Sequence, residues 1–448
     1  MTIYGQAALT IVGRSQQKAR VLPCDVEGCI AICWKQCSLS QQGEGTGSNV
    51  TTVDEAGALA WAMADSRRGT RATVDLDAVG HNVRLVRRTI GPDVGVMAVL
   101  KADAYGHGAV PVARACLAAG ASWLAVATVD EGVALRRAGI DASLLLIAPT
   151  FPEEYAVAVA HDLSVGVGSL GMAAELATVA RQAGTVARVH VEVDTGLNRF
   201  GIPAQRAVDE IAALPALPGL ALEGAYTHFV ASETPQGGSA GAQLALFREI
   251  VDGARARGIY IPLLHASNSG GVLELPGAHF DLVRPGIALY GYHPAGPGSR
   301  SESGLESGSG ADGLRPVMTL STRLVRVERV PPGAGVSYNG TFRTARESVL
   351  GLVPLGYGDG LPRLLSNRGH MLVRGRRCPI VGRVCMDQTV LDLTDVPGAA
   401  MGDEVVAIGR QGEERIGADD IGALVGTNAY EVLCGIAPRV PRDYVGHP

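Results

Sequence analysis

The chain has 448 residues, 47% of them hydrophobic and 19% charged, and a formal net charge of -5. Its length predicts two domains, and its composition is that of an ordinary globular protein. The mild negative charge, with no run of basic residues, argues against nucleic acid as a partner. No stretch approaches the roughly 18 uninterrupted apolar residues of a membrane span, so we expect a cytoplasmic protein without a membrane contact.

Lysine is scarce in this chain. Only Lys18, Lys35 and Lys101 occur, and arginine supplies the other basic side chains. Arginine replaces lysine well as a solvated cation, but it stays protonated and cannot attack a carbonyl as an amine can. Lys101 follows an apolar run, where a side chain can project into a site above a sheet or barrel. We therefore predict that Lys101 acts as a nucleophile.

The first 62 residues differ in composition from the remainder. They contain Cys24, Cys29, Cys33 and Cys37, without an accompanying histidine. This spacing is not the paired pattern of zinc ribbons, so we expect no metal site. We interpret residues 1–62 as a disordered N-terminal extension, and a protein that begins at Met63 should keep its activity. The other four cysteines are expected to be reduced and buried.

Hydrophobic periodicity predicts a barrel over residues 70–292. Residues 71–78 alternate like a half-buried strand, and residues 81–89 carry the apolar stripe of a helix. Eight strand-like runs follow, at residues 95–100, 123–127, 144–148, 163–167, 187–193, 221–227, 262–266 and 280–284. Alanine-rich helical stretches lie between them, at residues 110–119, 131–138, 172–183, 204–213 and 242–257. This α/β alternation is typical of a (β/α)8 TIM-type barrel. The competing doubly wound sheet would want Gly-x-Gly-x-x-Gly after its first strand, and that spacing is missing here.

The composition changes after residue 292. Residues 293–315 are rich in glycine, serine and proline, and they predict a flexible linker or surface loop. Residues 316–448 contain short alternating runs separated by glycine and proline, which predicts an all-β domain. Its expected strands are residues 322–330, 348–353, 370–373, 390–393 and 404–408. Residues 71–77 are a candidate additional strand of this domain.

Reactive side chains gather at the carboxyl ends of the predicted barrel strands, where such barrels carry their active sites. Beside Lys101, these side chains are Glu192, Asp194, Asn198, Arg199, His228, His265, Asn268, Ser269 and Arg284. A single lysine there points to imine chemistry with the carbonyl of a substrate or of pyridoxal phosphate. Burial and the neighbouring arginines would lower its pKa. Ser269 could contact a phosphate group, although a Ser-Gly-Gly turn can equally cap a helix.

These residues lie within motifs that resemble the alanine racemases, pyridoxal-phosphate enzymes built from a barrel and a β domain. The stretch Lys101-Ala-Asp-Ala-Tyr-Gly-His-Gly is similar to their cofactor-lysine motif. The likeness runs in order from residue 70 to residue 446, through Asp194-Thr-Gly-Leu-Asn-Arg-Phe-Gly, Thr227-His-Phe, Asn268-Ser, Val283-Arg-Pro-Gly-Ile, Val336-Ser-Tyr-Asn-Gly, Gly356-Tyr-Gly-Asp-Gly, Gly382-Arg-Val-Cys-Met-Asp-Gln and Arg439-Val-Pro-Arg.

The resemblance implies a two-base racemisation of alanine. Lys101 would hold pyridoxal 5'-phosphate and exchange a proton on one face of the substrate α-carbon. Tyr338 would act on the opposite face from the β domain of a partner subunit, so the enzyme would be a homodimer with shared active sites. His228 and Arg284 would assist Tyr338. Arg284 would also face the pyridine nitrogen of the cofactor, which would stay unprotonated because arginine keeps its protons.

The same resemblance implies binding roles for further residues. The cofactor phosphate would be bound by Tyr105, Ser269, Gly286, Ile287 and Tyr430. Arg199 and the backbone at Met386 would hold the substrate carboxylate, with Asn268 and Asp387 in supporting positions. Many family members carry a carbamylated lysine where this chain has Glu192, and we infer that this glutamate supplies the negative charge directly by pairing with Arg199. The Gly356 and Arg439 motifs are expected to form turns or an interface, without a chemical role.

Other functions stay open at this point. A racemase of a larger or more polar amino acid, such as serine, would use the same residues. A related barrel-fold amino-acid decarboxylase would use a cysteine and an aspartate of its second domain, and Arg284 and Tyr338 favour the racemase over it. A barrel that only binds pyridoxal phosphate would lack the β domain. The expected role of the enzyme is to make D-alanine for peptidoglycan.

Overall fold

The computed structural model describes residues 69–233, 239–298 and 313–447, so the extension predicted for residues 1–62 lies outside the described part. Parallel strands close into a barrel in the order β2-β3-β4-β5-β6-β8-β9-β10, because β10 pairs with β2 and β5 with β6. Each strand falls on one of the eight predicted runs. They are β2 (Gly95–Val99), β3 (Trp123–Val126), β4 (Ser143–Leu146), β5 (Ser164–Val167), β6 (Ala187–Asp194), β8 (Leu220–Tyr226), β9 (Leu263–His265) and β10 (Leu282–Val283), and the short β7 (Ile202–Pro203) pairs with β6.

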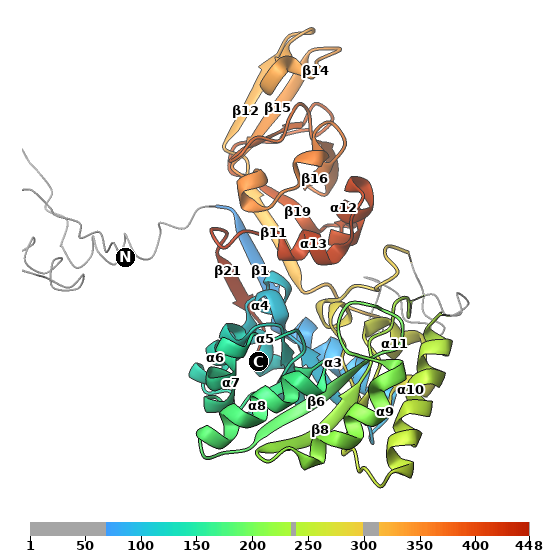
Figure 1. Cartoon of the computed structure of the whole chain (residues 1–448). Helices are drawn as coiled ribbons and strands as arrows, with labels where there is room; N and C mark the ends of the chain where they lie inside the picture. The colour runs from blue at the N-terminus through green and yellow to red at the C-terminus, as the bar shows by residue number, and fades with distance from the viewer. Residues whose placement is uncertain (1–68, 234–238, 299–312, 448) are drawn as a thin grey trace, which may run out of the picture. The chain divides into compact units, whose positions relative to one another are not determined.

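Helices follow the barrel strands and lie outside them, as Figure 1 shows for α6 to α10. The first begins at Leu76, earlier than predicted, because the Asp75 side chain accepts the Ala78 N–H at 3.0 Å and caps it. The short α7 was not predicted. The helices are α3 (Leu76–Ile90), α5 (Ala109–Ala118), α6 (Val129–Arg137), α7 (Tyr155–Ala160), α8 (Leu170–Gln182), α9 (Ala204–Ala213), α10 (Ser239–Ala256) and α11 (Ser269–Glu274).

The second part of the chain is mostly β. Its main sheet has the order β17-β16-β19-β11-β1-β21, with β20 paired to β19, and smaller sheets are β12-β15-β18 and β13-β14. The strands are β11 (Met318–Arg323), β12 (Arg326–Val330), β13 (Gly335–Val336), β14 (Phe342–Arg343), β15 (Ser348–Val353), β16 (His370–Val373), β17 (Arg376–Pro379), β18 (Thr389–Asp392), β19 (Glu404–Gln411), β20 (Glu414–Ile416) and β21 (Arg442–Val445).

One expectation for this part was wrong. The single strand predicted at 322–330 is broken at Leu324 and Val325, because the Leu324 backbone bonds to Gly402 and Asp403 whereas the Val325 N–H donates to the Leu352 carbonyl, so the two halves belong to different sheets. The domain is mostly β, as expected, and it also contains two helices, α12 (Ala418–Val425) and α13 (Ala429–Cys434). The sequence carries start signals for both helices, acidic residues in the first turn of α12 and Asn428 as the N-cap of α13.

The first strand, β1 (Arg71–Asp75), belongs to the main sheet of the second part. It pairs antiparallel with β11, Thr73 opposite Thr319, and parallel with β21, Thr73 opposite Asp443. The predicted strand at 71–78 therefore ends at Asp75, where α3 takes over.

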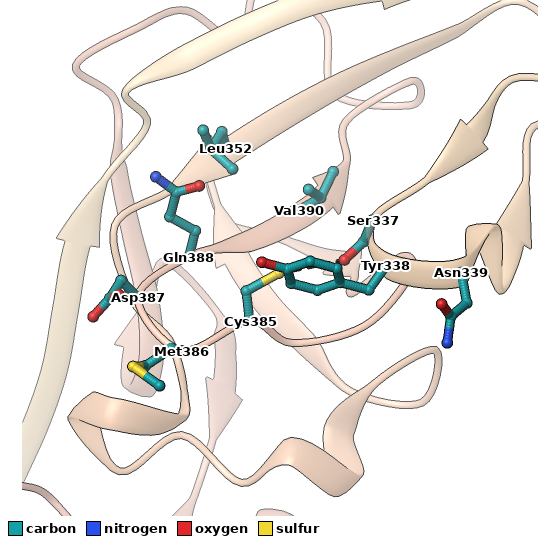
Figure 2. Close-up of a pocket in the computed structure, with 9 residues that line it drawn as sticks. All are labelled: Ser337, Tyr338, Asn339, Leu352, Cys385, Met386, Asp387, Gln388 and Val390. Carbon is teal, nitrogen blue, oxygen red and sulfur yellow. Dashed lines mark hydrogen bonds between the residues drawn. The ribbon is translucent and has the colours of Figure 1, made fainter.

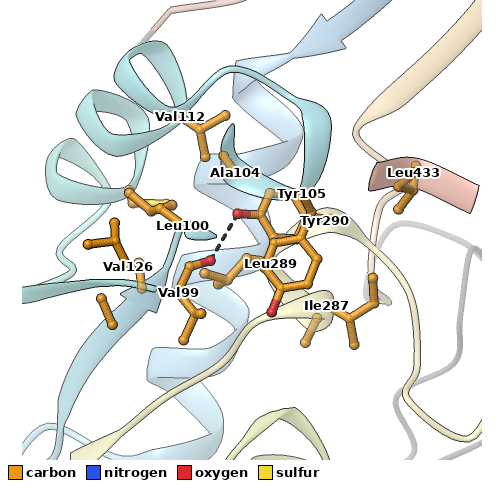
Figure 3. Packing of buried hydrophobic residues seen from close by; sticks show 14 of the residues in the cluster. Val99, Leu100, Ala104, Tyr105, Val112, Val126, Ile287, Leu289, Tyr290 and Leu433 are labelled. Atoms are coloured by element: carbon orange, nitrogen blue, oxygen red, sulfur yellow. Dashed lines mark hydrogen bonds between the residues drawn. The ribbon is translucent and has the colours of Figure 1, made fainter. Parts of the chain in front are cut away.

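The barrel core extends up to the lysine strand. Tyr290 is fully buried and donates a hydrogen bond from its hydroxyl to the Val99 carbonyl at 3.0 Å (Figure 3). The centroid of its ring lies 4.7 Å from the ring centroid of Tyr105 and 4.6 Å from that of His107. These aromatic contacts fix the end of β2, after which Lys101 follows. Among the described helices, none is long and apolar enough to cross a membrane.

Candidate active site

A pocket of about 220 Å³ opens at the carboxyl ends of the barrel strands. Its charged lining residues are Lys101, Glu192, Arg199 and Arg284, with His228 and Tyr226 beside them. The remaining lining residues are Ala127, Ile147, Ala148, Pro149 and Phe200. The barrel therefore brings together the lysine, the two arginines, the histidine and the glutamate that the sequence singled out, although they are far apart along the chain.

Lys101 begins a strained turn directly after β2. Element α4 (Lys101–Gly106) has left-handed backbone angles at each residue from Ala102 to Tyr105, with φ between 52° and 54°. This conformation costs a residue with a side chain about 1–2 kcal/mol. Surrounding contacts must therefore impose the turn, and such strain is concentrated at functional sites.

Contacts on both sides hold this turn. Glu131 Oε1 accepts the Ala102 N–H at 2.6 Å, and Arg442 Nε donates to the Gly106 carbonyl at 3.1 Å. Gly106 itself has a φ of 81°, and a Cβ there would lie 2.6 Å from the Leu433 carbonyl oxygen. The direction of the Lys101 side chain is therefore set by a turn that has little freedom to relax.

The surroundings of Lys101 favour a neutral amine. Burial lowers the pKa of Lys101, and the positive charge of Arg199 lowers it further. Burial also lowers the pKa of His228 to about 3, and repulsion by Arg284, Arg199 and Lys101 contributes. His228 is therefore uncharged at neutral pH, with its Nδ1 3.5 Å from Arg284 Nη2.

Arg284 is a buried cation with several fixed acceptors. It is 3% exposed, and its Nη2 donates to the carbonyls of Thr227 at 2.8 Å and Ala266 at 3.1 Å. Its Nη1 donates to His265 Nδ1 at 2.7 Å, and its guanidinium carbon lies 5.1 Å from the ring centroid of Tyr226. Burial lowers the pKa of Arg284 to about 10, so the side chain remains charged at neutral pH.

Glu192 lies in the same pocket but does not form the expected pair. In the described part of the chain no ion pair joins it to Arg199, because Glu192 is 3% exposed on β6 whereas Arg199 lies exposed in the following loop. Burial raises the pKa of Glu192 to about 6, and Tyr226, Arg284 and Arg199 partly offset that effect. The carboxyl group thus acts on both arginines through longer-range attraction.

The five residues predicted to bind phosphate are neighbours, namely Tyr105, Ser269, Gly286, Ile287 and Tyr430. Ser269 Oγ accepts the backbone N–H groups of Gly286 at 2.9 Å and Ala288 at 3.2 Å. A Cβ on Gly286 would lie 2.5 Å from the Tyr105 hydroxyl, so glycine permits that approach. The ring of Tyr430 lies 5.9 Å from that of Tyr105.

Asn268 has a structural position beside this cradle. Its side chain caps α11 by accepting the Gly271 N–H at 3.1 Å, and it accepts the Ser232 hydroxyl at 2.6 Å. The Asn-Ser-Gly-Gly turn is thus a helix cap, while the hydroxyl of Ser269 faces the segment after β10.

Tyr338 and Met386 line a different pocket, of about 710 Å³. Figure 2 shows the Tyr338 ring beside the sulfur of Cys385, with Met386 and Asp387 on the adjoining loop. No described residue lines both this pocket and that of Lys101. A single chain therefore carries the two predicted bases in separate cavities.

Tyr338 is held outward by a second strained turn. It is 69% exposed and stands between Ser337, with a φ of 61°, and Asn339, with a φ of 65°. Ser337 Oγ anchors the turn by donating to the Arg383 carbonyl at 2.7 Å. A tyrosine presented in this way on a strained turn is available to a group outside its own domain.

The loop that carries Met386 is held by the Gly356 and Arg439 motifs, for which no chemical role was expected. The turn at residues 356–360 donates a backbone N–H to the Met386 carbonyl at 2.8 Å. Arg439 bridges the fully buried Asp359, at 2.8 Å, and Asp387, at 2.7 Å. These motifs therefore position the predicted substrate-binding loop.

The structure corrects other expectations and adds residues. Cys116 and Cys378 are buried as predicted, whereas Cys385 is partly buried and Cys434 is exposed, since both lie on segments that border the pockets and the lysine turn. Sequence reasoning missed Tyr226, which ends β8 and lines the Lys101 pocket; its place at the carboxyl end of a predicted barrel strand was the available signal.

Comparisons with known protein families and known proteins give the same result over most of the chain. The model of the alanine racemase N-terminal domain matches residues 74–294, and that of the C-terminal domain matches residues 317–444. The chain is 41% identical to the alanine racemase of Halothermothrix orenii, over 84% of this chain and 97% of that protein. It is 42% identical to alanine racemase 2 of Caldanaerobacter subterraneus subsp. tengcongensis, over 86% and 96%.

Solved structures show the same likeness. Alanine racemase from D-cycloserine-producing Streptomyces lavendulae has a TM-score of 0.79 at 38% identity, covering 86% of this chain and 99% of that one. Alanine racemase from Bacillus anthracis with bound L-Ala-P has a TM-score of 0.77 at 36% identity, covering 85% and 95%. With both domain models matched in order, the chain belongs to the alanine racemase family, a family of isomerases.

Proposed function

We propose that this protein interconverts L-alanine and D-alanine with pyridoxal 5'-phosphate, and that it supplies D-alanine for peptidoglycan. The observation that carries the proposal is the pair of strained turns, one presenting Lys101 and the other presenting Tyr338. Racemisation needs two groups that exchange a proton from opposite faces of one carbon, and a lysine and a tyrosine on separate turns can supply them.

The barrel pocket fits the cofactor. The pKa of Lys101 is lowered, so its amine can attack an aldehyde. Ser269 Oγ already accepts two backbone N–H groups, so its own hydroxyl hydrogen is available to a phosphate oxygen. Tyr105, Gly286, Ile287 and Tyr430 would complete the phosphate site. When bound, pyridoxal phosphate supplies an electron sink that makes the α-proton of the amino acid more acidic.

The protein side chains would divide the remaining work. Lys101 would exchange the proton on one face and Tyr338 on the other. Arg284, which can only donate hydrogen bonds, would face the pyridine nitrogen and keep it unprotonated. Arg199 and the backbone N–H at Met386 would hold the substrate carboxylate. Neutral His228 accepts from Arg284 and would help Tyr338 lose its proton.

The separate pockets support a homodimer with shared sites. Because Lys101 and Tyr338 line different cavities of one chain, a complete site would combine the barrel of one subunit with the second domain of its partner. In such a head-to-tail pair, each subunit gives its tyrosine to the other and receives one in return.

Subunit complementation tests both the residues and the dimer. Lys101→Arg and Tyr338→Phe should each abolish racemisation, measured by the circular-dichroism decay of L-alanine. Co-expression of the two variants should restore about a quarter of the wild-type activity, because half of the dimers are mixed and each mixed dimer has one intact site. Failure to recover activity, with mixed dimers present, would reject shared sites.

The same assay over a panel of amino acids tests the substrate. Alanine should decay fastest, and serine is the informative competitor. A preference for serine, or loss of carbon dioxide in place of racemisation, would overturn the proposed reaction while leaving the complementation result intact.

A further inference from the structure

A continuous line of polar groups leads from the buried Arg284 through two buried histidines to the partly exposed Glu223. Arg284 Nη1 lies 2.7 Å from His265 Nδ1, and His265 Nε2 lies 2.8 Å from His190 Nδ1. His190 Nε2 lies 3.3 Å from Glu223 Oε2. These residues come from strands β9, β6 and β8, so the barrel assembles them from distant parts of the chain.

The chemistry at its two ends fixes the direction of every hydrogen bond in the line. A guanidinium group has no acceptor, so His265 Nδ1 must be unprotonated and His265 must carry its hydrogen on Nε2. That hydrogen points at His190 Nδ1, which must therefore accept. His190 then carries its own hydrogen on Nε2 and donates it to the carboxylate of Glu223. One neutral tautomer of each ring satisfies all three contacts.

The environment leaves these rings little freedom to turn or to become charged. His190 and His265 are both 0% exposed. The His265 ring stacks on Tyr226, with centroids 4.8 Å apart and planes 7° from parallel, and Trp123 packs edge-on against His190 at 5.2 Å. Burial lowers the pKa of both histidines, in keeping with the neutral forms that the hydrogen bonds require.

Glu223 is anchored at the far end of the line. It accepts the Ser164 hydroxyl and pairs with Arg188 Nε at 3.4 Å, and Arg188 is held in turn by Asp162 at 2.7 Å. Glu223 lies on β8 three residues before Tyr226, nearer the amino end of the strand than the pocket, and it does not line the pocket. Its carboxylate is thus a fixed acceptor away from the proposed chemistry.

We propose that Glu223, His190 and His265 are positioning residues that set the proton arrangement around Arg284 and hold its guanidinium in one orientation. The consequence for catalysis rests on the proposed function, in which Arg284 faces the cofactor. Without the distant carboxylate the His190 Nε2–H loses its acceptor, and Arg284 alone selects this tautomer, so the other tautomer of both rings becomes populated. In that fraction His265 Nδ1–H opposes Arg284 Nη1–H, and the guanidinium has to move.

The test reads the tautomers directly. In the cofactor-loaded protein with 15N-labelled histidine, the 15N resonances of His190 and His265 should both show hydrogen on Nε2 and none on Nδ1. Glu223→Leu should change the tautomer signals of both rings and lower kcat for alanine about tenfold. Glu223→Gln keeps a carbonyl acceptor for His190 and should retain the wild-type tautomers.

Asp162→Asn is the matched control, because it alters the same Arg188 contact without touching the line of histidines, and it should leave tautomers and kcat unchanged. Hydrogen on Nδ1 of either ring in the wild-type protein would overturn the proposal, and this measurement needs no variant to fold. Unchanged signals and kcat in Glu223→Leu would also overturn it. A protein that fails to racemise alanine would refute the proposed function. The tautomer measurement would still decide whether Glu223, His190 and His265 are positioning residues.

Discussion

Glu192→Gln should make the protein more stable and less active. Glu192 is the only acid among the residues that line the Lys101 pocket, and it is 3% exposed. Burial raises its pKa from an ordinary value of 4.5 to about 6. At about 1.4 kcal/mol for each pKa unit, holding this carboxylate charged in the folded protein costs about 2 kcal/mol at neutral pH.

The pH dependence follows from the sign of that change. Above pH 6 the carboxyl group is charged in both folded and unfolded chains, so the full cost applies. As the pH falls from about 6 toward 4.5, the folded protein takes up the proton first and the cost disappears. The free energy of unfolding of Glu192→Gln should therefore exceed that of the wild type by up to about 2 kcal/mol above pH 6, and by little below pH 4.5.

Denaturant unfolding of the two cofactor-free proteins, measured across this pH range, gives the difference between their free energies of unfolding. The other carboxylates are the same in both proteins, so their contributions cancel in this difference. The activity of Glu192→Gln should be lower, with a higher KM for alanine. The reason is that Arg199 and Arg284 lose the negative charge that balances their positive charges. Glu175→Gln, an exposed change on α8, is the matched control and should alter neither quantity. A variant less stable than the wild type at neutral pH would show that attraction to the arginines outweighs burial, and the reasoning would fail.

Other changes test the remaining parts of the site. Glu192→Lys should give an enzyme whose activity rises with added bicarbonate, since a carbamylated lysine restores the negative charge. A wild-type enzyme that needs bicarbonate would contradict the inference that Glu192 supplies this charge directly. Gly286→Ala should weaken cofactor binding about tenfold, because its Cβ would lie 2.5 Å from the Tyr105 hydroxyl, and fluorescence titration with pyridoxal phosphate measures this; unchanged affinity would argue against the cradle. Arg439→Lys should raise the KM for alanine more than it lowers kcat, since it loosens the Met386 loop through Asp359 and Asp387, and an unchanged KM would remove that loop from substrate binding.

The barrel could be predicted from the sequence because its signal is local. Each strand is a short apolar run followed by an alanine-rich helix, and such periodicity requires no knowledge of distant contacts. The reactive residues at the strand ends could be grouped for the same reason, since a parallel barrel brings those ends to one face.

What could not be predicted depends on distant parts of the chain. Ala102 to Tyr105 would favour an ordinary right-handed turn, and the left-handed one exists because Glu131, Arg442 and the Leu433 carbonyl constrain it. The line from Arg284 to Glu223 is likewise invisible in the sequence, because the tautomer of each histidine is decided by a neighbour on another strand. The break at Leu324 cannot be seen in the sequence, because apolar and polar residues alternate in the same way in a bent strand and in a straight one.

The place of β1 has a consequence for how the chain is made. The ribosome produces Arg71–Asp75 first, yet both strands that pair with it, Met318–Arg323 and Arg442–Val445, come much later. The barrel strands can pair with one another as they emerge, whereas β1 keeps both edges unpaired until Met318–Arg323 has been made and one edge unpaired until Arg442–Val445 follows. A fragment cut after the barrel would carry this exposed strand permanently. Completion of the second domain, and not of the barrel, is therefore the step that covers both edges of β1.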